Sequence, residues 1–238
     1  MKHPPTSLVQ LVSEARSVTS AEGEMVVLLH GIGRTAGSMS VPASLLAEKG
    51  YAIDNIDYPS RSAPIARLAE GVNERLKAEK AGTNAKLHFV THSMGGLIVR
   101  HLVKEFRPPN LGRVVMLAPP NQGSEIADFL GDNFLFKKVY GPAGQDLRTR
   151  NESSGPVDFP LGVIAGTKSI DPISSLLLSG PNDGKVTEES TKVKGMTDHI
   201  ILPVNHTFLM RDARVLRQIE AFLEKGAFAP QVSGEAGQ

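Results

Sequence analysis

A serine placed between a strand-like apolar run and a helix-like apolar run is the strongest chemical feature of this sequence. The run Leu87–Val90 leads through Thr91-His92-Ser93 into the apolar segment Met94–Phe106. Small residues after the serine, Gly95 and Gly96, allow a strand and a helix to approach closely, and a helix N-terminus favours negative charge that develops beside it. The pattern predicts that Ser93 is a nucleophile presented on a sharp turn. The alternative is a serine that only caps the helix.

The motif around this serine departs from the common G-x-S-x-G form at one position. Thr91 stands where the first glycine is usual, while Gly95 keeps the more crowded side of the turn open. His92 could be mistaken for the base, but a residue next to the serine on a sharp turn points away from it. We therefore interpret His92 as structural.

A base and an acid follow the serine in the order that this strand-to-helix turn requires. His206 comes just after the apolar run Ile200–Val204, whereas His199 precedes that run and is expected at the opposite edge of the sheet. Asp183 lies in the polar turn 179–186, and Asp171 is the fallback acid. In this arrangement the histidine takes the proton of the serine as it attacks an ester carbonyl, and the aspartate holds the imidazole in the useful tautomer.

A glycine-containing loop after the first strong strand admits two interpretations. In His30-Gly31-Ile32-Gly33-Arg34, the backbone N–H of Ile32, together with that of Met94, would bind the oxyanion of a tetrahedral intermediate. The turn Gly31-Ile32-Gly33 also fits a dinucleotide-binding loop, with Asp57 at the distance of a ribose contact. That alternative leaves Ser93, Asp183 and His206 unexplained, and we favour the oxyanion loop.

Short apolar runs alternate with segments of helical period, which is typical of an α/β fold. The runs are continuous, as expected for strands buried on both faces, so we expect a single doubly wound, mostly parallel sheet with helices on both faces. The expected strands are Met25–Leu29, Ala52–Ile56, Leu87–Val90, Val114–Leu117, Leu161–Ala165 and Ile200–Val204. The expected helices are Val41–Lys49, Pro64–Glu79, Met94–Phe106 and Phe208–Leu223.

The 238 residues are enough for one such domain. We expect an N-terminal extension over 1–20, the domain over 21–225, and a flexible tail over 226–238. A Gly-, Pro- and polar-rich stretch over about 119–160 interrupts the alternation and is interpreted as a small insertion. Its apolar patch, with Phe129 and Phe134, would form a lid or an acyl-chain wall, or would simply pack on the sheet.

Composition excludes several classes of function. The formal net charge of +1, without a basic run interleaved with aromatic residues, disfavours nucleic acid as a partner. The absence of cysteine excludes thiolate catalysis and Cys-ligated metals, and no motif indicates another metal site or a cofactor. No apolar stretch has the length of a signal peptide or a membrane span, so a cytoplasmic location is expected. The oligomeric state stays open.

The chain resembles small bacterial lipases and the lipase-like relatives of GPI inositol-deacylases. The resemblance is carried by 30–34, 91–96, Leu117-Ala118-Pro119-Pro120-Asn121-Gln122-Gly123-Ser124, 183–186 and His206. It implies an α/β-hydrolase fold that needs no cofactor and acts on carboxylic esters, with lipid esters among the candidates. Position by position, it makes Ser93, Asp183 and His206 a triad, and Ile32 and Met94 the oxyanion donors. Thr91 and the second proline of Pro119-Pro120 depart from the commonest forms.

Three functions follow as hypotheses from these residues. The first is a lipase or carboxylesterase with a small-molecule or lipid ester as substrate. The second is an acyltransferase or thioesterase that uses the same triad. The third is a nucleotide-binding oxidoreductase, or a non-catalytic binding protein, built on the Gly31-Ile32-Gly33 turn.

Overall fold

The computed structural model describes residues 23–79, 85–124, 141–147, 155–169, 178 and 180–231. In these ranges the chain forms one parallel sheet of six strands in the order β2-β1-β3-β4-β5-β6. The strands are β1 (Met25–Leu29), β2 (Ala52–Ile56), β3 (Leu87–His92), β4 (Leu111–Leu117), β5 (Leu161–Gly166) and β6 (Asp198–Leu202). The expected parallel α/β fold is confirmed.

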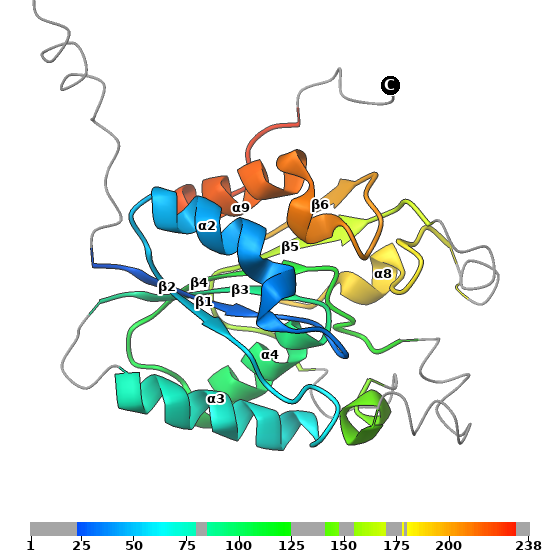
Figure 1. The fold of residues 1–238 in the computed structure, drawn as a ribbon. Helices are drawn as coiled ribbons and strands as arrows, with labels where there is room; N and C mark the ends of the chain where they lie inside the picture. The colour runs from blue at the N-terminus through cyan, green and yellow to red at the C-terminus, as the bar shows by residue number, and fades with distance from the viewer. Residues whose placement is uncertain are drawn as a thin grey trace, which may run out of the picture.

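Helices cover both faces of this sheet (Figure 1). They are α2 (Ser40–Glu48), α3 (Ile65–Glu79), α4 (Met94–Phe106), α8 (Glu188–Thr191) and α9 (Ala213–Lys225), with 3-10 turns η1 (Ala36–Met39) and η3 (Leu209–Arg211). Figure 1 places α2 and α9 on one side of the sheet and α3 and α4 on the other. None of these described helices combines the length and the apolar character that crossing a bilayer requires.

Alternate residues of the central strands fill two separate cores. Val27 and Leu29 of β1 pack with α3 and α4, while Val26 and Leu28 pack with α2 and α9. All four side chains are fully buried, because successive side chains of a strand point to opposite faces. Because both faces of these central strands are buried, their sequences are continuous apolar runs and do not alternate between apolar and polar residues.

The strand order brings the sequence-distant loops of the candidate site to one edge. In a parallel sheet, all strands end at the same edge, and the loops that follow β1, β3, β5 and β6 meet there. The segments with Ile32, Ser93, Asp183 and His206 are these loops. The topology therefore gathers the predicted site residues from four separate parts of the chain.

Several predicted boundaries differ from the observed ones. For example, β4 begins at Leu111 and not at Val114, and β3 ends at His92 and not at Val90. The last strand begins at Asp198 and ends at Leu202, two residues earlier than expected. The last helix begins only at Ala213, because Asp212 caps it by accepting a hydrogen bond from the N–H of Arg214 at 2.9 Å. The residues from Phe208 to Asp212 belong instead to the turn around η3.

The described part of the predicted tail packs on the domain. Phe228 is buried, its ring lies 5.0 Å from that of Phe222, and its N–H donates to the carboxylate of Asp198 at 2.8 Å. Residues 226–231 follow the end of α9 at Lys225, and the contacts of Phe228 hold this described part of the expected tail against the domain. The rest of that tail, the extension 1–20 and most of the expected insertion lie outside the described residues.

Candidate active site

Ser93 occupies a strained position between β3 and α4. Its backbone angles are φ 53° and ψ −125°, and Ala118 is the other non-glycine residue with positive φ in the described ranges. Such a conformation costs of order 1–3 kcal/mol and persists only where the surroundings impose it. Here the Ser93 N–H donates to the Leu117 carbonyl at 2.8 Å, and the Ser93 carbonyl accepts from Gly96 N–H at 3.0 Å.

The glycines after the serine are required by close packing. A Cβ on Gly95 would stand 2.6 Å from the Leu29 carbonyl oxygen, and one on Gly96 would stand 3.0 Å from Met116 Sδ. Thr91, in contrast, lies inside β3, where a side chain fits, although its buried hydroxyl has no partner among the described residues. The packing thus explains why the motif tolerates a threonine before the serine but needs glycine after it.

The strain at Ser93 has a measurable consequence. We expect the Ser93→Gly protein to exceed the Ser93→Ala protein in free energy of unfolding by about 1 kcal/mol, because glycine adopts positive φ without a Cβ penalty. Both variants lack the hydroxyl, so the difference between their free energies of unfolding reports the strain of the backbone at this position. Chemical denaturation measures it, and a glycine variant no more stable than the alanine variant would show that the turn is not strained.

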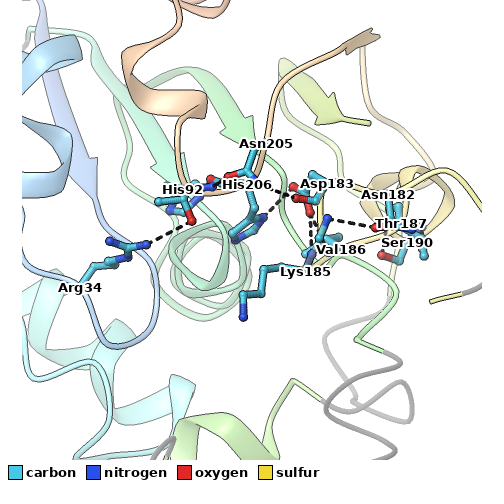
Figure 2. Close-up of polar contacts among 12 residues, drawn as sticks. Arg34, His92, Asn182, Asp183, Lys185, Val186, Thr187, Ser190, Asn205 and His206 are labelled. Carbon is cyan, nitrogen blue, oxygen red and sulfur yellow. Dashed lines mark hydrogen bonds and ion pairs between the residues drawn. The ribbon is translucent and has the colours of Figure 1, made fainter. Parts of the chain in front are cut away.

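Asp183 and His206 form a buried hydrogen-bonded pair (Figure 2). The distance from His206 Nδ1 to Asp183 Oδ2 is 2.7 Å. Because a carboxylate only accepts, Nδ1 carries the proton, and in the neutral ring Nε2 keeps a free lone pair. The other carboxylate oxygen accepts the N–H groups of Lys185 at 3.0 Å and Val186 at 2.8 Å. The aspartate is thereby fixed, and it holds the His206 ring with its proton on Nδ1.

His92 connects this pair to the serine turn. Its Nε2 lies 3.1 Å from the His206 carbonyl oxygen, so Nε2–H donates, and the two rings lie 4.7 Å apart. Burial, and then the neighbouring His206, lower the pKa of His92 well below the ordinary imidazole value of 6.5. His92 is therefore neutral near pH 7. The sequence did not reveal this contact, which joins residues 114 positions apart.

Ser93 lies beside His92 in the chain, but the hydroxyl is not hydrogen-bonded to His206. Within the described residues it has no hydrogen-bond partner, and the Ser93 residue is 8% exposed. In enzymes without substrate, such contacts are often long and tighten only in the complex. The structure thus pairs Asp183 with His206, and His206 in turn contacts His92, the residue before Ser93. The serine hydroxyl itself is unpaired among the described residues.

The loop after β1 is held firmly against the end of β2. The His30 ring stacks on Tyr58 at 4.1 Å, and the Tyr58 hydroxyl donates to the His30 carbonyl. The N–H of Gly33 donates to Ser60 Oγ at 2.9 Å, and the N–H of Ala36 donates to Asp57 at 2.9 Å. Asp57 thus holds the loop, whereas a dinucleotide site would need it to contact a ribose. The N–H groups of Gly33 and Ala36 already have acceptors in the protein, so they are not free to bind a pyrophosphate. Both observations disfavour the dinucleotide interpretation.

Two backbone N–H groups at this edge have no acceptor in the part of the chain that the structure describes. They belong to Ile32, in the loop after β1, and to Met94, the first residue of α4. The first N–H groups of a helix lack intrahelical acceptors and carry the positive end of its dipole. Both groups are available to an anion.

Other predicted residues are separated from this group or lie beyond the description. His199 is the second residue of β6, at the far end of that strand from His206, and its Nε2 lies 3.0 Å from Thr191 Oγ1. Phe129, Phe134 and the fallback acid Asp171 lie outside the described residues. No group of three or more His, Asp or Glu side chains suited to a metal ion occurs within the described ranges.

Two further contacts at this edge were not predicted. Arg34 donates to the hydroxyl of Thr207 at 3.4 Å, and Asn205 Oδ1 accepts the N–H of Thr207 at 2.9 Å. Both hold the chain around His206. In the sequence, the residues that make these contacts are marked only by their position shortly after predicted strands.

Burial of several histidines makes stability depend on pH. Burial lowers the pKa of four of them, His30, His88, His92 and His199. A lowered folded-state pKa means that the unfolded chain binds more protons below about pH 6.5, so this stability is present above that pH and is lost as pH falls toward the folded-state values. We expect the free energy of unfolding to fall between pH 7.5 and 5.5 in urea titrations. A constant value over that window would contradict the burial of these rings as neutral groups.

Comparisons with known proteins place the fold. In sequence, the chain is similar to the 2-hydroxy-6-oxo-6-phenylhexa-2,4-dienoate hydrolase of Comamonas testosteroni, at 29% identity over 147 residues, which are 54% of this chain. The match spans 49% of that protein, about half its length. In structure, the chain is similar to the mature Bacillus licheniformis lipase BlEst2, with a TM-score of 0.65 and 20% identity over 84% of this chain and 90% of that one.

A second solved structure agrees with the first. The metagenomic carboxyl esterase MGS0156 matches with a TM-score of 0.65 and 19% identity, over 80% of this chain and 66% of that one. These likenesses establish an α/β-hydrolase fold. The family described as a domain of unknown function (DUF7379) matches residues 3–134. The chain therefore belongs to the DUF7379 family and has the fold of the α/β-hydrolases.

Proposed function

We propose that this chain is a serine hydrolase that cleaves carboxylic esters, as a lipase or carboxylesterase. The observation that carries the proposal is the 2.7 Å bond between Asp183 and His206, which leaves His206 Nε2 free to accept a proton. The His206 ring lies 4.7 Å from the ring of His92, the residue before the strained Ser93. A buried acid, a base in a fixed tautomer and an unpaired serine hydroxyl are the parts that acyl transfer needs.

The reaction proceeds in two steps. His206 Nε2 takes the proton of Ser93 as Oγ attacks the ester carbonyl, and the imidazolium returns that proton to the leaving alcohol. Water then attacks the acyl-enzyme, with His206 as base, and releases the acid and free Ser93. Asp183 stabilises the imidazolium throughout.

The oxyanion that forms in each step needs two donors. Met94 directly follows Ser93, and Gly31, the neighbour of Ile32, packs so close that a Cβ on it would stand 3.2 Å from Ser93 Cβ. The free N–H groups of Ile32 and Met94 would bind the oxyanion, and the α4 dipole adds positive potential. These residues are all from the chain itself, so the proposed mechanism uses no cofactor.

A panel of p-nitrophenyl esters from acetate to palmitate tests this function, with the Ser93→Ala protein as control. We expect release of p-nitrophenol that depends on Ser93, and the preferred acyl length reports the depth of the acyl site. The same assay with acyl thioesters, and with added alcohol, separates hydrolysis of esters from thioesterase or acyltransferase activity. No turnover of any member of the panel would count against the proposal.

A further inference from the structure

A cavity of about 590 Å³ flanks α4 away from the residues of the candidate active site. It lies between α4, the start of α3, and the segment that precedes β5. Its apolar wall includes Ile65, Val103, Val157 and Phe159. We call it the α4 cavity. A cavity of this size accommodates a small organic molecule.

A buried arginine without a carboxylate partner lines the α4 cavity. Arg100 is only 6% exposed. Its guanidinium donates to the Asn121 carbonyl at 2.9 Å, to Asn121 Oδ1 at 3.2 Å and to the Gly155 carbonyl at 2.8 Å. Burial alone lowers its pKa to about 10, with no contribution from a nearby carboxylate. Buried charges are ordinarily paired, so this one lacks its usual compensation.

A guanidinium carries five N–H donors, so the three hydrogen bonds of Arg100 leave two donors without an acceptor among the described residues. The three hydrogen bonds of Arg100 use its terminal nitrogens, and its Nε–H has no acceptor among the described residues. The fully shielded side-chain atoms without a partner in the same ranges are Asn55 Oδ1, Thr91 Oγ1 and His92 Nδ1. Arg100 Nε is not among them, so this atom is not fully shielded, and Arg100 is one of the residues that line the α4 cavity.

The charges that line the cavity leave an excess of one positive unit. Arg107 and Asp158 form a pair at 2.8 Å, and Asp146 accepts the N–H of Ile65 at 2.7 Å. Three cations, Arg100, Lys104 and Arg107, thus face two carboxylates. Lys104 also approaches Glu105 at 3.7 Å, but both side chains are exposed and the contact is weak. Arg100 and Lys104 lie four positions apart on one face of α4, and Arg107 follows the end of this helix.

We propose that the α4 cavity binds an organic monoanion, a carboxylate carried on a short apolar chain. The carboxylate would compensate Arg100, with Lys104 at the mouth of the cavity, and the chain would contact Val103, Val157 and Phe159. A dianion such as phosphate would exceed the available charge. This site is separate from Ser93 and does not depend on the proposed function.

Calorimetric titration of the full chain with octanoate tests the site, using the Ser93→Ala protein so that catalysis is not involved. We expect a Kd below about 1 mM. Lys104→Glu is expected to weaken binding at least tenfold. Lys77→Glu, at a matched exposed position on α3, should leave binding unchanged, since Lys104 and Lys77 are 63% and 65% exposed.

Three outcomes would overturn the proposal. One is the absence of octanoate binding, which would leave Arg100 as a link between Asn121 and Gly155 only. Another is equal binding of octanol and octanoate, which would mean that no charge is recognised. The third is binding that Lys104→Glu does not affect, as expected for octanoate held at Ser93. Because Lys104 is exposed, its variant is expected to fold, and circular dichroism checks this.

Discussion

Replacing Ser93 or His206 by alanine is expected to lower kcat for the best p-nitrophenyl ester by about 10⁴-fold or more, while the fold stays intact. In the proposed mechanism, the serine supplies the attacking oxygen, and His206 Nε2 accepts its proton. The two residues act as one unit, so the double variant should lose little more than either single variant.

A matched histidine provides the control for this prediction. His199→Ala removes the other histidine near the last strand, whose ring contacts Thr191 at the far end of β6. Its activity should stay close to that of the parent protein. If His199→Ala abolished turnover and His206→Ala did not, the base would be misassigned.

Replacing Asp183 by asparagine is expected to lower kcat by about 10⁴-fold through the tautomer of His206. The asparagine oxygen can still accept the N–H groups of Lys185 and Val186. Its NH₂ group then faces His206 Nδ1, which must become an acceptor, and the ring proton moves to Nε2. A ring protonated at Nε2 cannot take the proton of Ser93.

An aspartate at a helix cap controls for loss of a charge alone. Asp212→Asn keeps the cap of α9 and changes no contact of Asp183 or His206, so its kcat should be unchanged. Full activity of Asp183→Asn would transfer the role of the acid to another carboxylate, with Asp171 as the first to test by the same substitution.

Three elements were predicted to the residue, although one of them, β2, is a partly buried strand at the edge of the sheet. The strands β1 and β2 and the helix α4 begin and end at the expected residues. The edge strand β6 was displaced, because its first residues, Asp198 and His199, are polar and only partly buried. Apolar runs mark buried backbone, and a strand at the edge of a sheet does not need them.

The candidate site was predictable as residue types but not as contacts. Chain order and strand ends pointed to Ser93, Asp183 and His206. The bond between Asp183 and His206 depends on β5 and β6 being neighbours, and the bond from His92 to His206 depends on packing across β3 and the loop after β6. Nothing in local sequence encodes either distance. The missing counter-charge of Arg100 is likewise a property of the packed structure.

Covalent labelling of the serine is the most direct test of the central claim, that Ser93 is a nucleophile activated by His206. A fluorophosphonate reacts when the serine oxygen attacks phosphorus and fluoride departs. We expect intact-mass spectrometry to find one adduct per chain and peptide mapping to locate it on Ser93, with no adduct on Ser93→Ala and much slower labelling of His206→Ala. An unlabelled parent protein, or equal labelling of the Ser93→Ala protein, would contradict the account.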